Sequence, residues 1–412
     1  MNKLLKWGLK NRKEPGVTIR EMLAMLQANL NKNDTRPLVH LGIGDPSVHP
    51  CFRTTPLAEN AIVHSLRSSH FNGYAPSAGI SAARRAVADY LCEDLPYKLS
   101  EEDVFLTAGG NHAIEILLTV LARPGANILF PRPGYPLYEA RAEFSGLEVR
   151  HFDLVPDRGW EVDLDAIEAL ADDKTIAMVT INPGNPCGNV FTFEHMQRIA
   201  ETARRKGIIL IADEVYGHLV FGDSKFVPMG TLGSVAPILT LGTLSKRWLV
   251  PGWRLGWIAA TDPQGILSES GVTDSIRDFM GLTADPATII QGAVPEILKN
   301  SPQSFFLKTN NLLREAADVC YTKVSEIPSL KCSHRPEGAM STMVKLNLST
   351  LDGVVDDMDF ALKLAKEESV LVMPGTVVGL KNWLRVSFAV ELDALKVGFE
   401  RIGEFSSRHA KK

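Results

Sequence analysis

The chain is poor in the residues and motifs that mark several functional classes. Its five cysteines are scattered and odd in number, so we expect neither a disulfide framework nor a CxxC metal or redox motif. The ten histidines show no metal-ligand spacing, and neither Gly-x-Ser-x-Gly nor His-Glu-x-x-His occurs. We therefore predict no metal site, and reduced thiols of the kind typical of a cytoplasmic protein.

Charge and hydropathy exclude further classes. The formal net charge is only −4, which offers no basic field for nucleic acid. The longest apolar runs are far shorter than the roughly 18 residues of a transmembrane helix, and the first ten residues lack the apolar stretch of a secretion signal. With 412 residues, 45% of them hydrophobic, the sequence predicts an enzyme-sized globular protein of about two or three domains that binds neither nucleic acid nor membrane.

The middle of the chain alternates apolar runs with helical patterns. Continuous apolar runs of strand length occupy residues 103–107, 126–130, 175–181, 208–212 and 237–241, and helices are expected at 112–121 and 192–206. Such alternation predicts βαβ units and a mostly parallel sheet covered on both faces. From residue 285 onward long helical stretches appear, followed by a mixed α+β pattern. The fold class is therefore α/β, with a second, smaller α+β part.

One lysine stands out at the end of the last of these strands. Ser245 directly precedes Lys246, Thr243 lies three positions before it, and Arg254 follows eight positions after it. A desolvated lysine amine is nucleophilic, and two hydroxyls with an arginine can hold a phosphate. A nucleophilic amine beside a phosphate site is what an enzyme using pyridoxal phosphate requires.

Other polar residues follow the ends of the remaining strands. Because the carboxyl ends of parallel strands meet at one edge of a sheet, we expect these residues to meet there. They are Gly109, Gly110, Asn111, Tyr135, Asn185, Asp213, Tyr216 and Lys246. The turn at 109–111 lies between a strand and a helix N-terminus, an arrangement that binds phosphate through free backbone N–H groups.

The same residues suit the ring of the cofactor. Asp213 needs a cationic partner, which a protonated pyridine nitrogen supplies. Tyr216 and Asn185 can hydrogen-bond the phenolic oxygen of the ring, and Tyr135 can stack on its face. Taken singly, Asp213 is also a helix cap, Asn185 a turn residue, Tyr135 a packing residue and Lys246 a surface amine. Their joint order favours a cofactor site, with Lys246, Asp213 and Tyr216 as catalytic residues.

The lysine segment carries a resemblance. Residues 245–257 read Ser-Lys-Arg-Trp-Leu-Val-Pro-Gly-Trp-Arg-Leu-Gly-Trp, which resembles the cofactor-lysine segment of the aspartate aminotransferase superfamily, and in particular its tyrosine aminotransferase branch. The resemblance implies a pyridoxal-phosphate-dependent transferase of fold type I, with a mostly parallel, seven-stranded type of sheet. It also implies an N-terminal segment (1–50) that joins the small domain, a large cofactor-binding domain (51–295) and a small C-terminal domain (296–412).

The resemblance assigns roles to three residues that the pattern alone leaves open. Tyr74 would reach the cofactor phosphate of the other subunit in a homodimer whose active site lies at the subunit interface. Arg385 would clamp the α-carboxylate of the substrate, although by its own strand pattern it is an ordinary surface arginine. Gly42 would let that carboxylate approach the backbone, and Asn185 would lie beside it. Gly42 begins a Gly-Ile-Gly turn that lacks the third glycine of a dinucleotide fingerprint.

The function that the resemblance implies is transamination by a ping-pong mechanism, in which Lys246 moves the α-proton of the substrate. L-Tyrosine, converted to 4-hydroxyphenylpyruvate, with 2-oxoglutarate or a similar 2-oxo acid as acceptor, is the leading substrate pair. The same branch includes nicotianamine aminotransferases and carbon–sulfur lyases, which remain alternatives. A non-enzymatic binding protein is disfavoured, because a chemically competent residue occupies every position of the site.

Overall fold

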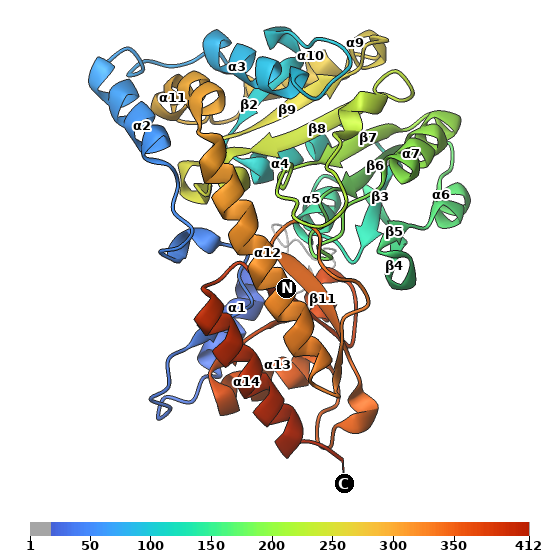
Figure 1. Ribbon diagram of the computed structural model, residues 1–412. Helices are drawn as coiled ribbons and strands as arrows, with labels where there is room; N and C mark the ends of the chain where they lie inside the picture. The colour runs from blue at the N-terminus through green and yellow to red at the C-terminus, as the bar shows by residue number, and fades with distance from the viewer. Residues whose placement is uncertain (1–17, 412) are drawn as a thin grey trace, which may run out of the picture.

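Two regions, each built around its own sheet, make up the protein. The computed structural model describes residues 18–411, and Figure 1 shows the two regions with the long helix α12 (Gln303–Ser325) running from one to the other. Within these residues, no helix combines the length and the apolar composition that crossing a bilayer requires.

The larger sheet has eight strands in the order β2-β9-β8-β7-β6-β3-β4-β5. Their bounds are β2 Val104–Thr107, β3 Asn127–Arg132, β4 Glu148–Val155, β5 Glu161–Val162, β6 Thr175–Ile181, β7 Ile209–Asp213, β8 Ile238–Thr243 and β9 Gly256–Thr261. Only β9 and the two-residue edge strand β5 run against the others, so the predicted mostly parallel sheet is confirmed. Without β5, the array is the seven-stranded sheet that the resemblance implied.

Helices cover both faces of this sheet, as the continuous apolar strands require. One face packs against α4 (Gly110–Val120), α5 (Leu137–Phe144), α9 (Ile266–Glu269) and α10 (Val272–Met280). The other face packs against α6 (Leu164–Leu170), α7 (Phe193–Lys206), α2 (Pro56–Ser68), α3 (Ser81–Cys92) and α11 (Thr288–Asn300). Neighbouring residues of one strand therefore enter different cores, which fixes the register of every strand.

Local signals in the sequence set the helix bounds closely. In α7, the Thr192 side chain accepts a hydrogen bond from the backbone N–H of His195 and so caps the first turn. Basic residues fill the last turn, and Gly207 ends the helix with a positive φ of 65°, a conformation that glycine adopts without strain. The helix predicted at 192–206 is thus confirmed to within one residue.

The smaller region combines a four-stranded antiparallel sheet with a short parallel pair. The sheet has the order β10-β11-β14-β13 (Leu330–Lys331, Ser341–Leu346, Trp383–Ser387, Met373–Pro374), and β1 (Val39–His40) pairs with β12 (Val370–Leu371). Helices α1 (Ile19–Ala28), α13 (Asp357–Glu368) and α14 (Leu392–Arg408) share its core with α12. The apolar stretch 370–373 resembles one strand in the sequence, but the chain there contributes to both sheets in turn, as β12 and then β13. The domain boundaries given above stay a prediction.

Candidate active site

Lys246 lies where β8 turns into α8 (Leu244–Arg247), at the carboxyl edge of the large sheet. Its Nζ donates a hydrogen bond of 2.6 Å to the backbone carbonyl of Gly44 and lies 5.5 Å from the centre of the Tyr216 ring. Tyr216 is itself almost fully buried. The amine is thus held at one position beside an aromatic phenol, which is an arrangement that suits proton transfer.

Asp213 ends β7 and is 5% exposed. Its carboxylate accepts hydrogen bonds from the hydroxyl of Tyr138 (2.9 Å) and the backbone N–H of Val215 (3.3 Å), both neutral donors. Burial raises the pKa of Asp213 to about 6, although the two hydrogen bonds and the charge of Lys246 oppose the shift. A buried carboxylate without a cation at hydrogen-bond distance is costly, and a pyridinium nitrogen would offset that cost.

Tyr138 is a site residue that the sequence did not reveal. It lies in the first turn of α5, is 2% exposed, and its ring stands edge-on to Tyr135 at 6.4 Å between centres. Burial raises the pKa of Tyr138 well above the ordinary value, and the adjacent Asp213 adds to the shift, so the phenol stays a donor. The only signal in the sequence was its position one turn after Tyr135.

Gly109 and Arg254 together form the turn before α4. Gly109 has a φ of +81°, and a β-carbon there would overlap the Arg254 guanidinium. Arg254 donates to the carbonyl of Ala108 (3.1 Å) and to that of Pro251 (2.7 Å), while remaining exposed. An exposed guanidinium beside the N-terminus of an eleven-residue helix that begins at Gly110 suits a phosphate group.

Thr243 and Ser245 face the same edge with their hydroxyls 2.8 Å apart. Both side chains are buried, and Thr243 caps α8 by accepting from the backbone N–H of Ser245. The Thr243 hydroxyl also donates to the carbonyl of Leu255 (2.7 Å). Thr243 therefore holds the turn in shape, and the direct contact of either hydroxyl with a phosphate stays a prediction.

Two further predicted residues, Tyr135 and Asn185, follow β3 and β6 at the same edge of the sheet. The Tyr135 hydroxyl donates to Asn111 Oδ1 at 3.3 Å, which joins the loops after β3 and β2. Burial raises the pKa of Tyr135, and the neighbouring Tyr216 and Asp213 raise it further, so this phenol is close to both. Asn185 is partly buried in the loop after β6. In the same loop, the side chain of Asn182 accepts a hydrogen bond from the backbone N–H of Phe191 and so holds the shape of the loop.

Arg385 comes from the small sheet and is 5% exposed. The interpretation of Arg385 as an ordinary surface arginine is wrong, because β14 lies in the interior of its sheet with β11 and β13 on either side. Its Nη2 donates to the carbonyl of Gly42 at 2.8 Å, whereas its Nε is buried without a partner. Burial lowers the pKa of Arg385, yet a guanidinium stays charged in proteins. The unpaired Nε fits a carboxylate.

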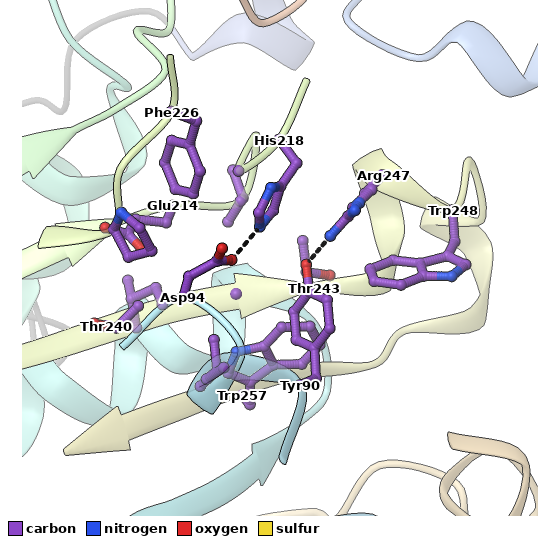
Figure 2. Close-up of a pocket in the computed structure, with 16 residues that line it drawn as sticks. Tyr90, Asp94, Glu214, His218, Phe226, Thr240, Thr243, Arg247, Trp248 and Trp257 are labelled. Atoms are coloured by element: carbon purple, nitrogen blue, oxygen red, sulfur yellow. Dashed lines mark hydrogen bonds and ion pairs between the residues drawn. The ribbon is translucent and has the colours of Figure 1, made fainter. Parts of the chain in front are cut away.

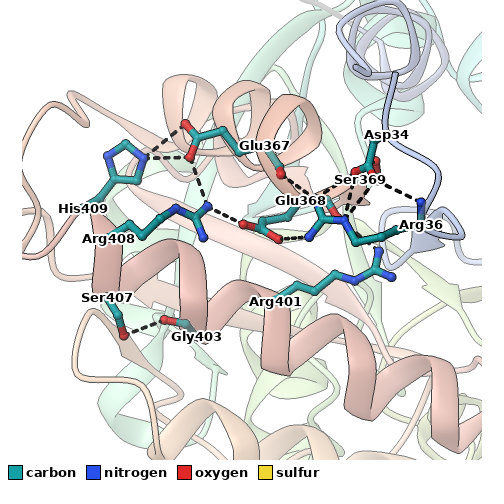
Figure 3. A network of polar contacts seen from close by, with 10 residues as sticks. All are labelled: Asp34, Arg36, Glu367, Glu368, Ser369, Arg401, Gly403, Ser407, Arg408 and His409. Carbon is teal, nitrogen blue, oxygen red and sulfur yellow. Dashed lines mark hydrogen bonds and ion pairs between the residues drawn. The ribbon is translucent and has the colours of Figure 1, made fainter. Parts of the chain in front are cut away.

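The N-terminal arm, residues 36–44, contacts both Lys246 and Arg385. At its start, the carboxylate of Glu368 accepts hydrogen bonds from Arg36 (2.7 Å) and Arg408, as Figure 3 shows. Arg401 also donates to the carbonyl of Pro37 (2.8 Å). Strand β1 then pairs with β12. After β1, the carbonyl of Gly42 accepts from Arg385 and the carbonyl of Gly44 accepts from Lys246. The sequence predicted a short strand entering a glycine turn here, and β1 confirms the strand, but the contacts with Lys246 and Arg385 were not expected, because contacts hundreds of residues apart leave no local pattern.

Comparison with known proteins agrees with this geometry. A family model described as aminotransferase class I and II matches residues 36–402. The chain belongs to this family. Pyridoxal phosphate is therefore its cofactor. In Asp213 and in the turn between Gly109 and Arg254, the aminotransferase has the buried acid and the exposed cation that the ring and the phosphate of this cofactor need.

Relatives of the aminotransferase divide among several activities. It is 55% identical over 396 residues to nicotianamine aminotransferase 1 of Oryza sativa subsp. japonica, covering 96% of this chain and 80% of that protein. It is 51% identical over 403 residues to an S-alkyl-thiohydroximate lyase of Arabidopsis thaliana, covering 98% and 87%. The crystal structure of tyrosine aminotransferase from Leishmania infantum superimposes with a TM-score of 0.87 at 30% identity, covering 97% of this chain and all of that one.

Tyr74, a further predicted site residue, is exposed rather than packed among these side chains. It lies in the loop between α2 and α3 and is fully exposed. Its predicted contact, with the cofactor phosphate of a second subunit, stays a prediction.

Proposed function

We propose that the chain is an aminotransferase that takes the amino group of an aromatic amino acid, L-tyrosine first, and passes it to 2-oxoglutarate or a similar 2-oxo acid. The observation that carries this proposal is the pair of contacts on the N-terminal arm. Lys246 is bound to the carbonyl of Gly44 and Arg385 to that of Gly42. A base and a carboxylate anchor so close together suit a substrate that carries its reacting carbon next to a carboxylate.

Each residue then has one task. Arg385 receives the α-carboxylate through its free Nε and one Nη, as a bidentate pair that aligns every amino acid in the same way. Lys246 would leave the Gly44 carbonyl and move the α-proton of the substrate, acting first as a general base and then as a general acid. Bound pyridoxal phosphate supplies the electron sink for this step. Asp213 keeps the ring nitrogen protonated, while Tyr216 and Asn185 bind the phenolic oxygen.

The phosphate is held, in this proposal, by the turn Gly109–Asn111 with Ser245 and Arg254. Thr243 supports them by fixing the turn before Lys246. Tyr135 stacks against the ring, and Gly42 completes the substrate carboxylate site. A second subunit contributes Tyr74, so the active unit is a homodimer with its sites at the interface. The complete exposure of Tyr74 in one chain supports this part of the proposal.

Tyrosine is the favoured donor for two reasons. Residues 245–257 resemble the tyrosine aminotransferase branch, and a tyrosine aminotransferase superimposes along nearly the whole chain. Nicotianamine is the second candidate, since a nicotianamine aminotransferase is among the relatives above half identity. Carbon–sulfur cleavage would use the same lysine but remove a group at Cβ, and the similarity to a lyase supports this third activity.

The test is a visible absorption spectrum of the cofactor-loaded protein as L-tyrosine is added without any 2-oxo acid. We expect the cofactor band to disappear while 4-hydroxyphenylpyruvate forms, at most one molecule per subunit, because the amino group remains on the enzyme in a ping-pong half-reaction. Later addition of 2-oxoglutarate should restore the band and yield glutamate.

Other outcomes assign the activity elsewhere. A band that tyrosine leaves unchanged but nicotianamine removes would replace the donor and keep the aminotransferase. Pyruvate and a free thiol released from an S-substituted cysteine, with the band retained, would identify a lyase. A protein that binds no cofactor, even when it is supplied, would contradict the whole assignment.

A further inference from the structure

The end of α3 lies in a pocket behind the cofactor edge of the large sheet. Figure 2 shows Tyr90, in the last turn of α3, directed at Arg247, and Asp94, two residues beyond the helix, directed at His218. Tyr90 and Asp94 are four positions apart on one segment, and they contact two turns that are distant from each other in the chain. Each of these turns carries a proposed catalytic residue.

The first turn is α8, where Arg247 directly follows Lys246. The Arg247 Nη1 donates to the Tyr90 hydroxyl, and its guanidinium carbon lies over three rings, at 5.4 Å from Tyr90, 5.5 Å from Trp248 and 4.4 Å from Phe306. Its Nε is buried without a hydrogen-bond partner, so the rings and the Tyr90 hydroxyl hold the group. A helix of four residues has no stability of its own, and tertiary contacts must fix it.

The second turn follows β7, where His218 lies two residues after Tyr216. Its Nε2 is 3.0 Å from Asp94 Oδ2, and its ring stands edge-on to Phe226 at 4.9 Å between centres. The hydrogen bond to His218 lowers the pKa of Asp94, so the acid is ionised and binds strongly. His218 has a φ of +62°, a conformation that residues other than glycine adopt only where contacts hold them.

We infer that Tyr90 and Asp94 are positioning residues that hold Lys246 and Tyr216 at the spacing the reaction needs. This inference rests on the proposed roles of Lys246 and Tyr216. Neither Tyr90 nor Asp94 touches the reacting atoms; each acts through its partner, Arg247 or His218. Lys246 and Tyr216 come from different turns, which follow the paired strands β8 and β7, and a support shared by both turns fixes the side chains beyond the strand ends.

The groups around this support are suited to rigidity. Glu214 lines the same pocket, and its carboxylate accepts from the backbone N–H of Met229 at 2.6 Å. Asp94 faces His218, and Arg247 faces aromatic rings. Burial, with Asp213 and Asp94 nearby, raises the pKa of Glu214 to about 8, so Glu214 stays neutral beside these acids at pH 7. A displacement of about 1 Å at a reacting group can cost on the order of 100-fold in rate, so a support that prevents it has a measurable kinetic effect.

The first experiment uses the cofactor-free chain and measures amide hydrogen exchange in segments 214–219 and 244–249. Tyr90→Phe is expected to speed exchange in 244–249 and Asp94→Asn in 214–219, by roughly 10-fold, because each loses one of the contacts that hold the turn closed. Two controls keep exchange at the wild-type rate in both segments. Asp89→Asn removes an exposed acid from α3, and Tyr97→Phe removes a hydroxyl that binds the carbonyl of Gly230 instead.

The second experiment separates positioning from general stability in the cofactor-loaded enzyme. Tyr90→Phe and Asp94→Asn should each lower kcat by about 10-fold with KM within twofold, since substrate binding at Arg385 is untouched. Both should also shift the pH midpoint of the visible cofactor band, which depends on the groups around the lysine. The Asp94→Glu variant keeps the acceptor and should recover most of the rate.

The double variant tests whether the two contacts serve one purpose. If Tyr90 and Asp94 fix a single spacing between Lys246 and Tyr216, losing the second contact costs less than losing the first, and the combined fall in kcat is smaller than the product. Independent structural effects would multiply.

The inference is overturned if both variants unfold at lower temperature, as Tyr97→Phe would, while kcat, the band midpoint and local exchange match the controls. Failure of the proposed function gives a different result. In that case the wild-type chain would not deaminate any amino acid, yet the exchange experiment on the cofactor-free chain would still report whether the two turns depend on Tyr90 and Asp94.

Discussion

The site residues on the large sheet and those on the small sheet differ in how far their hydrogen-bonding groups are already paired. On the large sheet, Asp213 has two hydrogen-bond donors, Arg254 binds two carbonyls, and Thr243 is engaged with Ser245 and Leu255. On the small sheet, Arg385 binds one carbonyl and leaves its Nε buried and unpaired. The half that we assign to the cofactor is pre-assembled, whereas the half assigned to the substrate holds an unmet hydrogen-bonding capacity.

This difference matches the times for which the cofactor and the substrate stay bound. A group that stays bound through many turnovers gains from a site held rigid by internal hydrogen bonds. A substrate must enter and leave, and a donor left unpaired at Arg385 costs about 1–3 kcal/mol until a carboxylate fills it. Arg385 on the small sheet then supplies the free energy that binds the amino acid, whereas the residues of the large sheet carry out the reaction. Each prediction below separates the two halves.

The largest effect is expected for Lys246→Ala. Removal of the amine should lower turnover on the order of 10⁴-fold or more, as loss of a central catalytic group does. The cofactor should still bind, because Asp213 and the phosphate turn remain. The matched control is Lys299→Ala, an exposed lysine on α11. Stopped turnover with retained cofactor absorbance supports the assignment, and normal turnover would remove Lys246 from the chemistry.

Replacement of Arg385 should affect only the substrate half. Arg385→Gln loses two charge-assisted hydrogen bonds of about 1.5–3 kcal/mol each, so kcat/KM for the amino acid should fall roughly 10²- to 10⁴-fold, chiefly through KM. Arg385→Lys should recover little, because an ammonium cannot form the planar pair. Cofactor affinity should match that of the exposed control Arg123→Gln. A large loss of cofactor from Arg385→Gln would mean that the two halves are not separable.

Asp213→Asn should affect the cofactor half. The amide keeps the contact with Tyr138 but loses the charge that pairs with the ring nitrogen, so we expect roughly 10- to 100-fold weaker cofactor binding and a lower kcat. Tyr138→Phe, which removes one donor and keeps the charge, should have a smaller effect in the same direction. Titration of the cofactor into both variants and into the exposed control Asp278→Asn measures this. Unchanged binding and rate in Asp213→Asn would exclude it from the site.

The sequence predicted the cofactor half well, for a physical reason. Buried parallel strands are continuous apolar runs, and their carboxyl ends share one edge, so residues such as Asp213 and Lys246 can be placed without any structure. Strand β9 was not expected, because it follows the lysine segment directly and lies antiparallel, without the crossover helix that marks a parallel strand.

The substrate half was far less predictable. Arg385 lies in a short strand whose local pattern is that of a surface strand, and only the neighbours β11 and β13 bury it. Gly44 entered the site through a contact between distant segments, as Tyr138 did on the cofactor half. The stretch 370–373 looks like one strand, yet its pairing changes at Val372, since the partner strands and not the local residues decide the sheet. Tertiary contacts of this kind leave no periodic signal.

The smallest effect concerns stability and again distinguishes the halves. Burial raises the pKa of Glu214 to about 8 from the ordinary 4.5, and the neighbouring Asp213 adds to the shift. Between these values the folded chain keeps a proton that the unfolded chain releases, so the contribution of Glu214 to the stability of the cofactor-free protein should be largest below pH 4.5, fall as the pH rises from 4.5 to about 8, and be level above that. Glu214→Gln should flatten this fall. At about 1.4 kcal/mol per pKa unit, the shift from 4.5 to about 8 corresponds to at most about 5 kcal/mol, and the partial exposure of Glu214 reduces that figure.

Asp213→Asn should flatten the same curve below about pH 6, where the pKa of Asp213 lies. Arg385→Gln should leave its slope unchanged, because a guanidinium does not titrate in this range. Urea unfolding of the cofactor-free variants at pH 5.5, 7 and 8.5 measures all three. A steeper slope in Glu214→Gln than in the unmodified chain would contradict the sign. If Arg385→Gln altered the pH dependence of the free energy of unfolding, the substrate half would also contain a titrating group. The distinction between a cofactor half that titrates and a substrate half with a permanent charge would then be wrong.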